Sequence, residues 1–344
     1  MASIKDVARL AGVSVSTVSR VLANSTSVDE ETKRKVDKAI DAINYKPNLL
    51  AQGLRSKSGY VIGLAVPEIL HETFSRFIRY TEQEVSALGY NLIIGNTKGM
   101  PDIEGAFIDT LLRRHVDGII FSRVSDKSQV IKIFEKWNIP VVIIDRALDR
   151  EDVPTVVLDN YRAGTIAAEH LVELGHRKFA VITGPQDIAL SRERLKGFTD
   201  VLESHGLFLV GRNICEGNFK FDSGLEAGKY LLENKIDFTA LWAQNDLMAL
   251  GAMNVFERNK LRLPEDISVV GMDNLSSAEM IVPTLTTVVQ PFQEMCHKAV
   301  EIIMTLKRGE KPKEKRIVLQ PDIIIRESTM AYYEHDTYVH HITN

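Results

Sequence analysis

Polar side chains that could bind a hydroxyl-rich ligand recur directly after apolar, β-branched segments. Asp145 follows Val-Val-Ile-Ile, Asn245 follows Leu-Trp-Ala-Gln, and Asp273 follows Ser-Val-Val-Gly-Met. Ligands of open α/β sheets bind at the carboxyl ends of the strands, where a carboxylate can accept two sugar hydroxyls. Arg194 adds a planar fork of donors, and Phe219 adds a flat face for a sugar ring. Each side chain could equally cap a helix or form an ion pair, so the pattern gives candidates.

The motifs of common α/β enzymes are missing from the sequence. No Gly-x-Gly-x-x-Gly follows the first apolar segment, and no Gly-x-Ser-x-Gly elbow occurs. Residues 224–229 resemble a phosphate-binding loop, but the spacing is one residue short and no Ser or Thr follows Lys229. The nine histidines and two cysteines have no convincing metal-ligand spacing. We therefore expect neither an enzyme nor a metal or cofactor site.

The elements that position these residues come after a head of short helices. Gly12 ends a first helix, Ser14 can cap a second, and Asp29 can cap a third. The apolar face expected on the first helix comprises Ile4, Val7, Ala8, Leu10 and Ala11. Two helices joined by this turn have the length of a helix-turn-helix. The outer face of the second helix carries residue types that reach base edges and phosphates, namely Ser16, Thr17, Ser19 and Arg20.

Charge separates this head from the rest of the chain. Residues 1–59 have a formal net charge of +4, whereas the remaining 285 residues have −8. A basic head on an acidic body favours nucleic acid as the partner of the head. With 44% hydrophobic and 26% charged residues, the chain is typical of a soluble globular protein. Because no apolar run reaches 18 residues and the N-terminus does not resemble a signal peptide, we expect a cytoplasmic protein without a membrane span.

From Tyr60 onward, apolar segments alternate with helical patterns. Repeated βα units predict parallel sheets, and nine such strands fit two subdomains better than one sheet. The expected strands are 61–66, 92–94, 118–121, 141–144, 156–158, 179–182, 240–242, 267–270 and 287–289. The expected helices are 73–88, 103–114, 161–174, 191–204, 223–234, 246–258 and 292–307. Pro321 lies within the last β-branched run, 317–325, which predicts a bent or edge element there.

A longer string of residues resembles the lactose/galactose repressor (LacI/GalR) family of bacterial transcriptional regulators. The head reads Ile4-Lys-Asp-Val-Ala-Arg-Leu-Ala-Gly-Val-Ser-Val-Ser-Thr-Val-Ser-Arg-Val-Leu, followed by Asn44-Tyr-Lys-Pro-Asn and Ala51-Gln-Gly-Leu. The resemblance continues through Val116-Asp-Gly-Ile-Ile, Leu174-Gly-His-Arg, Arg194-Leu-Lys-Gly-Phe, Val270-Gly-Met-Asp, Leu285-Thr-Thr-Val-Val-Gln and Ile325-Arg-Glu-Ser. It covers residues 2–328, in one order along the chain, which makes chance matching implausible.

The resemblance implies a homodimeric transcription factor that binds a pseudo-palindromic DNA operator. Its domains would be an all-α head with a hinge helix at 47–56 (residues 1–58), a periplasmic-binding-protein-like core (60–328) and a tail (329–344). The N-subdomain of the core would comprise 60–159 and 291–319, and the C-subdomain 160–289 and 320–328. The residues implied at the DNA are Ser14, Val15, Ser16, Thr17, Ser19, Arg20, Asn48, Ala51 and Leu54. A paired Leu54 would wedge into the minor groove and kink the operator.

The head departs from the family pattern at the end of the second helix. Relatives usually have Asn at the position of Ala23, whereas here Asn24 follows one residue later. Such a shift can still deliver the amide to a phosphate. We therefore expect Asn24 to make only a weak DNA contact.

In the core, the family implies a cleft that holds a small carbohydrate effector. The positions that match effector-binding positions of relatives are Phe74, Asp145, Arg146, Arg194, Phe219, Asn245, Asp273 and Gln290. Relatives commonly have Asn-Pro where this chain has His71-Glu72, which removes a cap and a first-turn proline from one cleft wall. Purine-responsive relatives add an Arg about six positions before the Arg194 position, where this chain has Ile188, so the sequence argues against a purine.

Several readings compete with this one. A sugar solute-binding protein would share the core but needs a signal segment and has no use for a basic head. A sugar kinase or isomerase would need phosphate or base motifs that the sequence lacks. Within the regulator reading, the effector is expected to be a small sugar or sugar phosphate, and a phosphorylated carrier-protein corepressor is the alternative. The tail has no leucine heptads, which favours a dimer over a tetramer.

Overall fold

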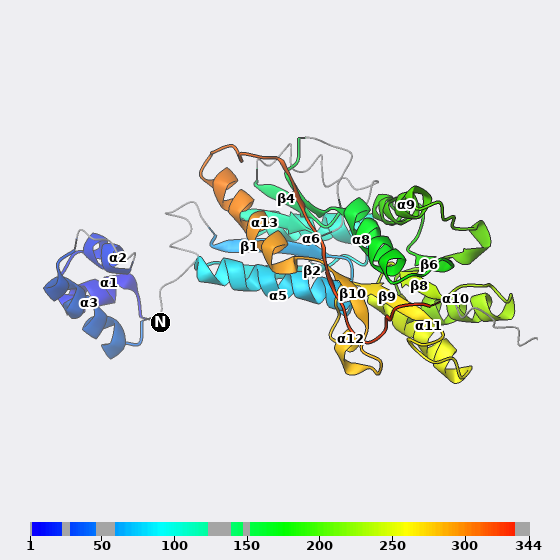
Figure 1. The fold of residues 1–344 in the computed structure, drawn as a ribbon. Helices are drawn as coiled ribbons and strands as arrows, with labels where there is room; N and C mark the ends of the chain where they lie inside the picture. The colour runs from blue at the N-terminus through cyan, green and yellow to red at the C-terminus, as the bar shows by residue number, and fades with distance from the viewer. Residues whose placement is uncertain (1, 23–27, 46–58, 123–138, 147–151, 334–344) are drawn as a thin grey trace, which may run out of the picture.

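The computed structural model describes residues 2–22, 28–45, 59–122, 139–146 and 152–333. The described residues form an all-α head and an α/β core with two sheets, which confirms the predicted fold class (Figure 1). Asn24, Asn48, Ala51 and Leu54, which we predicted at the DNA, lie outside the described residues. No helix among the described residues combines the length and the apolar character needed to cross a lipid bilayer.

The head contains α1 (Ile4–Ala11), α2 (Val15–Leu22) and α3 (Glu30–Ala42). Gly12 follows α1 with a φ of 69°, a left-handed conformation that glycine adopts without steric cost. The hydroxyl oxygen of Ser14 accepts a hydrogen bond from the Thr17 amide at 3.1 Å, and the Asp29 carboxylate accepts one from the Thr32 amide at 2.8 Å. Both predicted N-caps are therefore confirmed.

The head has its own small apolar core, to which all three of these helices contribute. Its buried members are Val7, Ala8, Val18, Val21, Val36 and Ala39. The prediction that Leu10 belongs to this face was wrong, because its side chain is 56% exposed. A short helix with two neighbours buries a narrow stripe, here formed by Ile4, Val7, Ala8 and Ala11, and Leu10 lies outside it.

The first six-stranded sheet of the core has the order β11-β5-β4-β3-β1-β2. Its strands are β1 (Val61–Val66), β2 (Asn91–Asn96), β3 (Gly118–Phe121), β4 (Val141–Ile144), β5 (Thr155–Leu158) and β11 (Arg316–Leu319), all parallel. Helices α5 (Glu72–Ala87) and α13 (Phe292–Lys307) cover one face, and α6 (Pro101–Arg113) covers the other. We call this sheet with these helices the first lobe.

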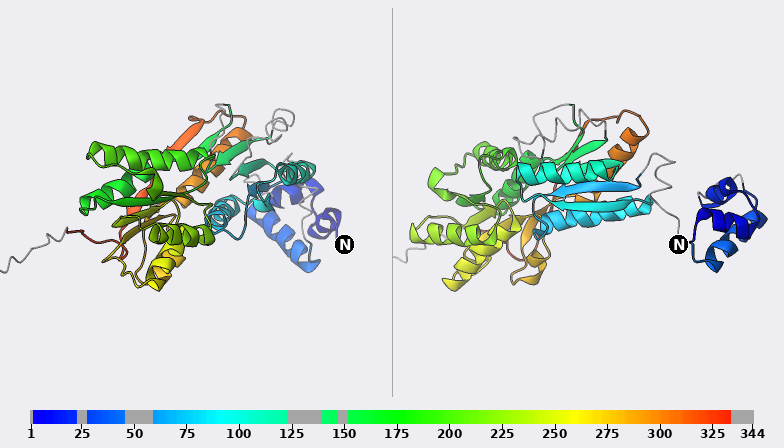
Figure 2. Two further views of the ribbon diagram at one scale, coloured as in Figure 1. Left: turned by 90° about the vertical axis from the view of Figure 1, so that its right-hand side faces the viewer. Right: turned by 180° about the vertical axis from the view of Figure 1, so that it is seen from behind.

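The second six-stranded sheet has the order β12-β10-β9-β8-β6-β7. Its strands are β6 (Phe179–Thr183), β7 (Ile214–Glu216), β8 (Ala240–Ala243), β9 (Ser268–Met272), β10 (Thr286–Val289) and β12 (Asp322–Ile324). Helices α8 (Asn160–Glu173) and α9 (Ala189–Ser204) cover one face, and α10 (Phe221–Glu233) and α11 (Asp246–Arg258) cover the other. We call this sheet, with these helices and the short α12 (Ser277–Met280), the second lobe (Figure 2).

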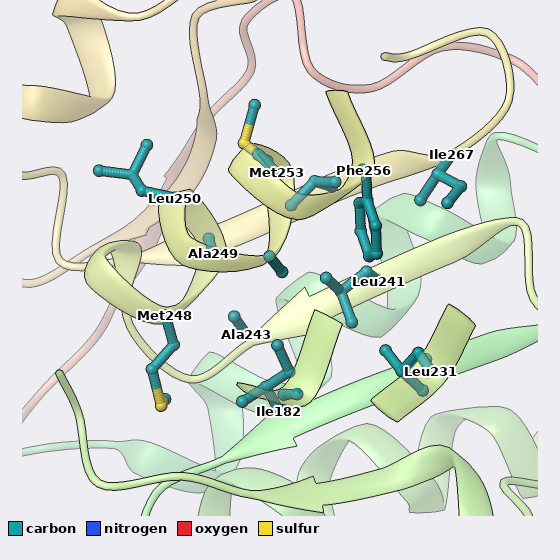
Figure 3. Packing of buried hydrophobic residues seen from close by; sticks show 14 of the residues in the cluster. Ile182, Leu231, Leu241, Ala243, Met248, Ala249, Leu250, Met253, Phe256 and Ile267 are labelled. Atoms are coloured by element: carbon teal, nitrogen blue, oxygen red, sulfur yellow. The ribbon is translucent and has the colours of Figure 1, made fainter. Parts of the chain in front are cut away.

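Apolar side chains fill both faces of each sheet. In the second lobe, Met248 and Phe256 of α11 point toward Ala243 and Leu241 of β8, and Met253 belongs to the same buried cluster (Figure 3). Burial on both faces explains why the central strands read as continuous apolar runs instead of alternating patterns.

All nine strands predicted between residues 61 and 289 exist. β7 was missed because only three residues pair at the edge of the sheet. The run 317–325 contains two edge strands: β11 pairs parallel with β5, whereas β12 pairs antiparallel with β10. The break falls at Gln320-Pro321, as the proline predicted.

The chain passes from one sheet to the other after β5, after β10 and between β11 and β12. Residues next to these crossings therefore lie where the two lobes meet, and Gln290 is one of them. Beyond residue 328 the chain still packs on the second lobe. The Tyr332 amide donates to the Leu174 carbonyl at 2.7 Å, and the Tyr332 ring stacks on His176.

Candidate functional site

In the head, helix α2 presents a polar face beside the tight turn at Gly12. Ser14, Ser16 and Arg20 are exposed, while Val15, Thr17 and Ser19 are half-buried. The Ser14 hydroxyl contacts the hydroxyls of Ser16 and Thr17 at 2.7 and 2.8 Å. A protruding helix with hydroxyls at its N-terminus and a cation one turn later can contact phosphates and base edges of a DNA groove.

In the core, Arg194 is the most enclosed cation among the described residues of the predicted site. Its side chain lies on α9 and is 4% exposed. Nε donates to Asn160 Oδ1 at 2.9 Å, and Nη1 donates to the Gln244 carbonyl at 2.9 Å. Burial lowers the pKa of Arg194, and the charges of Asp273 and Asp145 partly offset this effect. The guanidinium remains a cation, held in one orientation by two internal acceptors.

Asp273 and Gln290 form the second part of the predicted site. Asp273 follows β9 and Gln290 follows β10, and each is 4% exposed. Gln290 Nε2 donates to Asp273 Oδ1 at 2.5 Å, and the hydroxyl of Thr73, on α5 of the first lobe, donates to Asp273 Oδ2 at 3.3 Å. Burial raises the pKa of Asp273, and the nearby charge of Arg194 opposes this shift. The structure therefore brings Arg194, Asp273 and Gln290 together beside Thr73 of the first lobe.

Asn245 follows β8 and Phe219 follows β7, two strands of the second lobe with β6 between them. Asn245 caps α11: Oδ1 accepts from the Met248 amide at 2.9 Å, and Nδ2 donates to the Phe219 carbonyl at 2.8 Å. Phe219 has a φ of 65°, and its ring lies so close to Gly184 that a Cβ there would be 2.0 Å from the ring. Asn245 therefore has the capping role that the sequence left open, and the same side chain also holds the Phe219 carbonyl.

The first lobe contributes Asp145, Arg146 and Phe74. Asp145 and Arg146 follow β4, are partly exposed, and Asp145 has a φ of 79°. Phe74 lies in the first turn of α5, where its ring is 5.5 Å from the ring of His71. Arg192, which lies two residues before Arg194, is exposed and donates to the Gln186 carbonyl at 2.7 Å.

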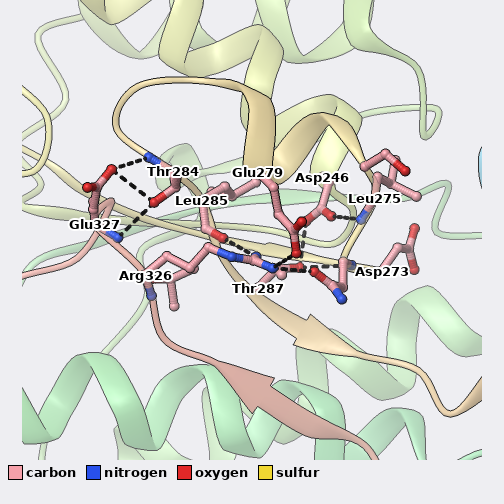
Figure 4. Close-up of polar contacts among 12 residues, drawn as sticks. Asp246, Asp273, Leu275, Glu279, Thr284, Leu285, Thr287, Arg326 and Glu327 are labelled. Atoms are coloured by element: carbon pink, nitrogen blue, oxygen red, sulfur yellow. Dashed lines mark hydrogen bonds and ion pairs between the residues drawn. The ribbon is translucent and has the colours of Figure 1, made fainter.

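Four further residues at the cleft were not among the predicted effector-binding residues, although the sequence places Asn160 and Asp246 directly after apolar segments. Asn160 and Gln244 hold the Arg194 guanidinium, and Thr73 reaches Asp273 from the first lobe. Asp246, the residue after Asn245, accepts from the Leu275 amide at 2.7 Å and the Thr287 hydroxyl at 2.6 Å (Figure 4). Asn160 and Asp246 follow apolar strands, which marks them as strand-end polar residues in the sequence, whereas nothing in the sequence indicates that Thr73 meets Asp273.

The lobes enclose polar atoms without partners. Within the described residues, no hydrogen bond engages Gln290 Oε1, Ser191 Oγ or His71 Nδ1, although all three atoms are buried. Burial raises the pKa of the Asp246 carboxyl, and the negative charge of Asp273 raises it further. An enclosed set of acceptors and hydroxyls beside one guanidinium suits a ligand that presents several hydroxyl groups.

The cleft is closed around these side chains. A groove of about 530 Å³ lies outside it, along α5 and α13, and shares Arg76, Asn274 and Gln290 with the cleft. Because Arg194, Asp273 and Gln290 are each 4% exposed, a ligand reaches them only when the two lobes move apart. No group of three His, Cys, Asp or Glu side chains within the described ranges is arranged to hold a metal ion.

Comparisons with known proteins match both parts of the chain. Residues 3–48 match the family of bacterial regulatory proteins of the lacI type, and residues 168–329 match a periplasmic binding protein-like domain. The transcriptional repressor PurR of Vibrio atlanticus is 35% identical over 330 residues, which cover 95% of this chain and 98% of PurR.

Two solved structures are similar over nearly the whole chain. The lac repressor dimer bound to operator and the anti-inducer ONPF has a TM-score of 0.85 at 29% identity, covering 96% of this chain and 99% of that one. The complex of the regulator CelR with cellobiose has a TM-score of 0.73 at 30% identity, covering 95% and 100%.

Proposed function

Because this chain belongs to the LacI family of bacterial regulatory proteins, we propose that it is a transcriptional repressor whose affinity for an operator responds to a small carbohydrate. The observation that carries the proposal is the combination, in one chain, of two features. The exposed polar face of α2 lies in the head, and an enclosed set of hydroxyl-binding side chains lies between two lobes. The family consists of regulators, and no catalytic step is needed to link these two features.

At the DNA, we assign direct contacts to the residues predicted from the sequence. Ser14, Val15, Ser16, Thr17, Ser19 and Arg20 would contact the major groove or its phosphates. Asn24, Asn48, Ala51 and Leu54 would add a phosphate contact and the minor-groove wedge. One recognition helix reads too few bases for a specific site, so a homodimer on a pseudo-palindrome is proposed. The lac repressor dimer bound to its operator supports this arrangement.

In the core, we assign the effector to Arg194, Asp273 and Gln290, with Asp145, Arg146, Phe74, Phe219 and Asn245 around it. Three buried acceptor or hydroxyl groups without partners support a sugar. The CelR complex with cellobiose supports the same ligand class. A purine is disfavoured as the effector, because Ile188 at the N-cap of α9 offers no donor to a purine base.

The remaining assignments follow from this function. We propose a cytoplasmic protein, because its DNA partner is there. We also propose the domain division stated from the sequence, with the head up to residue 58 and the core from 60 to 328. A phosphorylated carrier-protein corepressor is the second candidate for the effector, and it would bind outside the enclosed cleft.

A gel-shift assay with the native promoter region tests the DNA half of the proposal. We expect a retarded band with the parent and a weaker one with Arg20→Ala, by about 1–3 kcal/mol of binding free energy. Arg20 is exposed, so the variant should fold like the parent. Absence of any retarded band would favour a solute-binding protein.

Calorimetry tests the effector half. The full chain is titrated with pentoses, hexoses, disaccharides and their phosphates, and with a purine base as the contrast. The proposal is supported if a sugar binds and also changes the amount of DNA in the retarded band. Binding of a phosphorylated carrier protein alone supports the second candidate.

A further inference from the structure

The first turns of α5 bridge the two lobes. Glu72 lies on α5 of the first lobe, but its Oε1 accepts from the amide of Ser276 at 2.8 Å and from the Ser276 hydroxyl at 2.9 Å. Ser276 precedes α12 in the second lobe. Although burial favours the neutral form of Glu72, the hydrogen bonds from Ser276 and then Arg76 lower its pKa. Glu72 is therefore an ionised acceptor for a segment of the other lobe.

Arg76, one turn later on the same helix, strengthens this bridge. Its Nη2 donates to Glu72 Oε1 at 2.9 Å and to the Asn274 carbonyl at 2.5 Å, and its Nη1 donates to the Asp273 carbonyl at 3.2 Å. The guanidinium also lies 5.6 Å from the ring centroid of Phe292. With side chains 31% and 22% exposed, Glu72 and Arg76 are largely shielded from water, so these charge-assisted bonds are stronger than surface contacts.

The segment that they hold is the turn 273–276, which carries the effector residue Asp273. Asp273 and Asn274 have positive φ values of 107° and 52°, a region that residues other than glycine adopt uncommonly. From the second lobe, Asp246 accepts from the Leu275 amide, and Arg326 donates to Asn274 Oδ1 at 2.7 Å (Figure 4). The turn is thus held by Asp246 and Arg326 of its own lobe and by Glu72 and Arg76 of α5 in the other lobe.

We propose that Glu72 and Arg76 are positioning residues that latch the turn 273–276 to α5, which keeps the lobes closed and the Asp273 carboxylate in its ligand-binding orientation. The latch consists of these two side chains and the turn. Ligand entry requires the lobes to part, so the latch must open and close again around the ligand. Its effect on effector affinity rests on the proposed function, whereas its effect on lobe closure does not. Relatives with Asn-Pro in place of His71-Glu72 would lack the Glu72 half.

The first experiment measures the distance between the lobes without any ligand. Spin labels are attached to Lys98→Cys, after β2, and Lys220→Cys, after β7, in the full chain. Cys215 and Cys296 are buried, and burial raises the pKa of their thiols to about 11 and about 12, so labelling is selective for the introduced cysteines. Dilution with excess unlabelled protein leaves one labelled protomer in each dimer.

The parent is expected to give one narrow distance distribution, and Glu72→Ala or Arg76→Ala a broader and longer one. Glu72→Gln keeps an acceptor for Ser276 and should restore part of the narrow distribution. The matched controls are Glu82→Ala and Arg79→Ala. Both residues are exposed on α5, and their contacts with Ser86 and with the Tyr80 ring stay within that helix. Unchanged distributions in the latch variants, or equal broadening in the controls, would overturn the latch.

The second experiment tests positioning through Asp273, using whichever sugar of the calorimetric panel binds the parent. Glu72→Ala should weaken its affinity by roughly tenfold, consistent with the loss of a charge-assisted bond. In an Asp273→Ala background, the same substitution should have almost no further effect, because the group that it positions is gone. Equal losses in both backgrounds would show that Glu72 does not act through Asp273. If no sugar binds the parent, the effector proposal fails, while the distance measurement still decides the latch.

Discussion

The two lobes share one strand order but differ in the chemistry at their strand ends. Each sheet has six strands, and the order β11-β5-β4-β3-β1-β2 of the first lobe corresponds position by position to the order β12-β10-β9-β8-β6-β7 of the second. In the second lobe, Asn245, Asp246, Asp273 and Gln290 are buried just after strand ends, and Arg194 of α9 is buried with them. In the first lobe, Asp145 and Arg146 at the corresponding edge are partly exposed. The same topology therefore places strand ends alike in both lobes, while the side chains at these ends differ in burial and chemistry.

The helices of the second lobe are also packed more closely than α6 of the first lobe. In the second lobe, α8 and α9 touch through glycines: a Cβ on Gly164 would lie 1.9 Å from the Arg194 carbonyl, and one on Gly197 would lie 1.9 Å from the Tyr161 carbonyl. In the first lobe, Gly105 of α6 has no neighbour within 4 Å of a built Cβ. The lobe that holds the enclosed site is therefore also the one whose helices tolerate the least change. Four predictions use this contrast.

The largest effect is expected from Gly164→Ala. The added methyl group collides with the backbone of α9, so the helix that carries Arg194 must shift, at a cost of about 3 kcal/mol in the free energy of unfolding. Urea unfolding, followed by circular dichroism, measures this loss. A variant as stable as the parent would show that the α8–α9 contact is not rigid.

The next effect concerns the effector and compares one substitution in both lobes. Asp273→Ala removes a carboxylate that is 4% exposed and should lower sugar affinity by about 1.5–3 kcal/mol, roughly 10- to 150-fold. Asp145→Ala removes a partly exposed carboxylate and should cost about 1 kcal/mol or less. Calorimetry with a sugar of the panel measures both. Equal losses would place the site evenly between the lobes.

A smaller effect concerns the pH dependence of stability, in which a buried histidine of the second lobe differs from the histidines of the first. Burial lowers the pKa of His176 in the second lobe to about 4, whereas His115 and His297 of the first lobe are exposed. The unfolded chain binds a proton at His176 near pH 6.5, but the folded chain does not. Stability should therefore fall as the pH drops from about 6.5 to about 4, by roughly 1–3 kcal/mol. Urea unfolding at pH 7.5 and 4.5 should show a smaller decrease for His176→Gln.

The smallest effect completes the glycine contrast. Gly105→Ala places a methyl group in open space on α6 and removes the backbone freedom of a helical glycine, so the protein should gain about 0.5–1 kcal/mol. The same denaturant experiment as for Gly164→Ala measures it. A loss instead of a gain would mean that the two lobes are equally intolerant of added volume.

Much of the fold could be predicted from local patterns. The caps at Ser14 and Asp29, the nine apolar strands and the break at Pro321 all depend on short-range physics, and the structure confirms them. The errors concern features that depend on contacts with other elements of the fold. Leu10 has helical spacing but no partner to cover it, and β7 is a strand only because β6 pairs with it.

The site divides in the same way. The sequence by itself determined the family, the βα order and the residue types at the strand ends, because each is a property of consecutive residues. Only the tertiary structure decided that Thr73, Glu72 and Arg76 of α5 meet a turn some 200 positions later, since that contact depends on how two separately folded sheets are joined. It also decided that Asn245 caps a helix while Arg194 and Asp273 are enclosed, because burial is set by the opposing lobe and not by the residue's own segment.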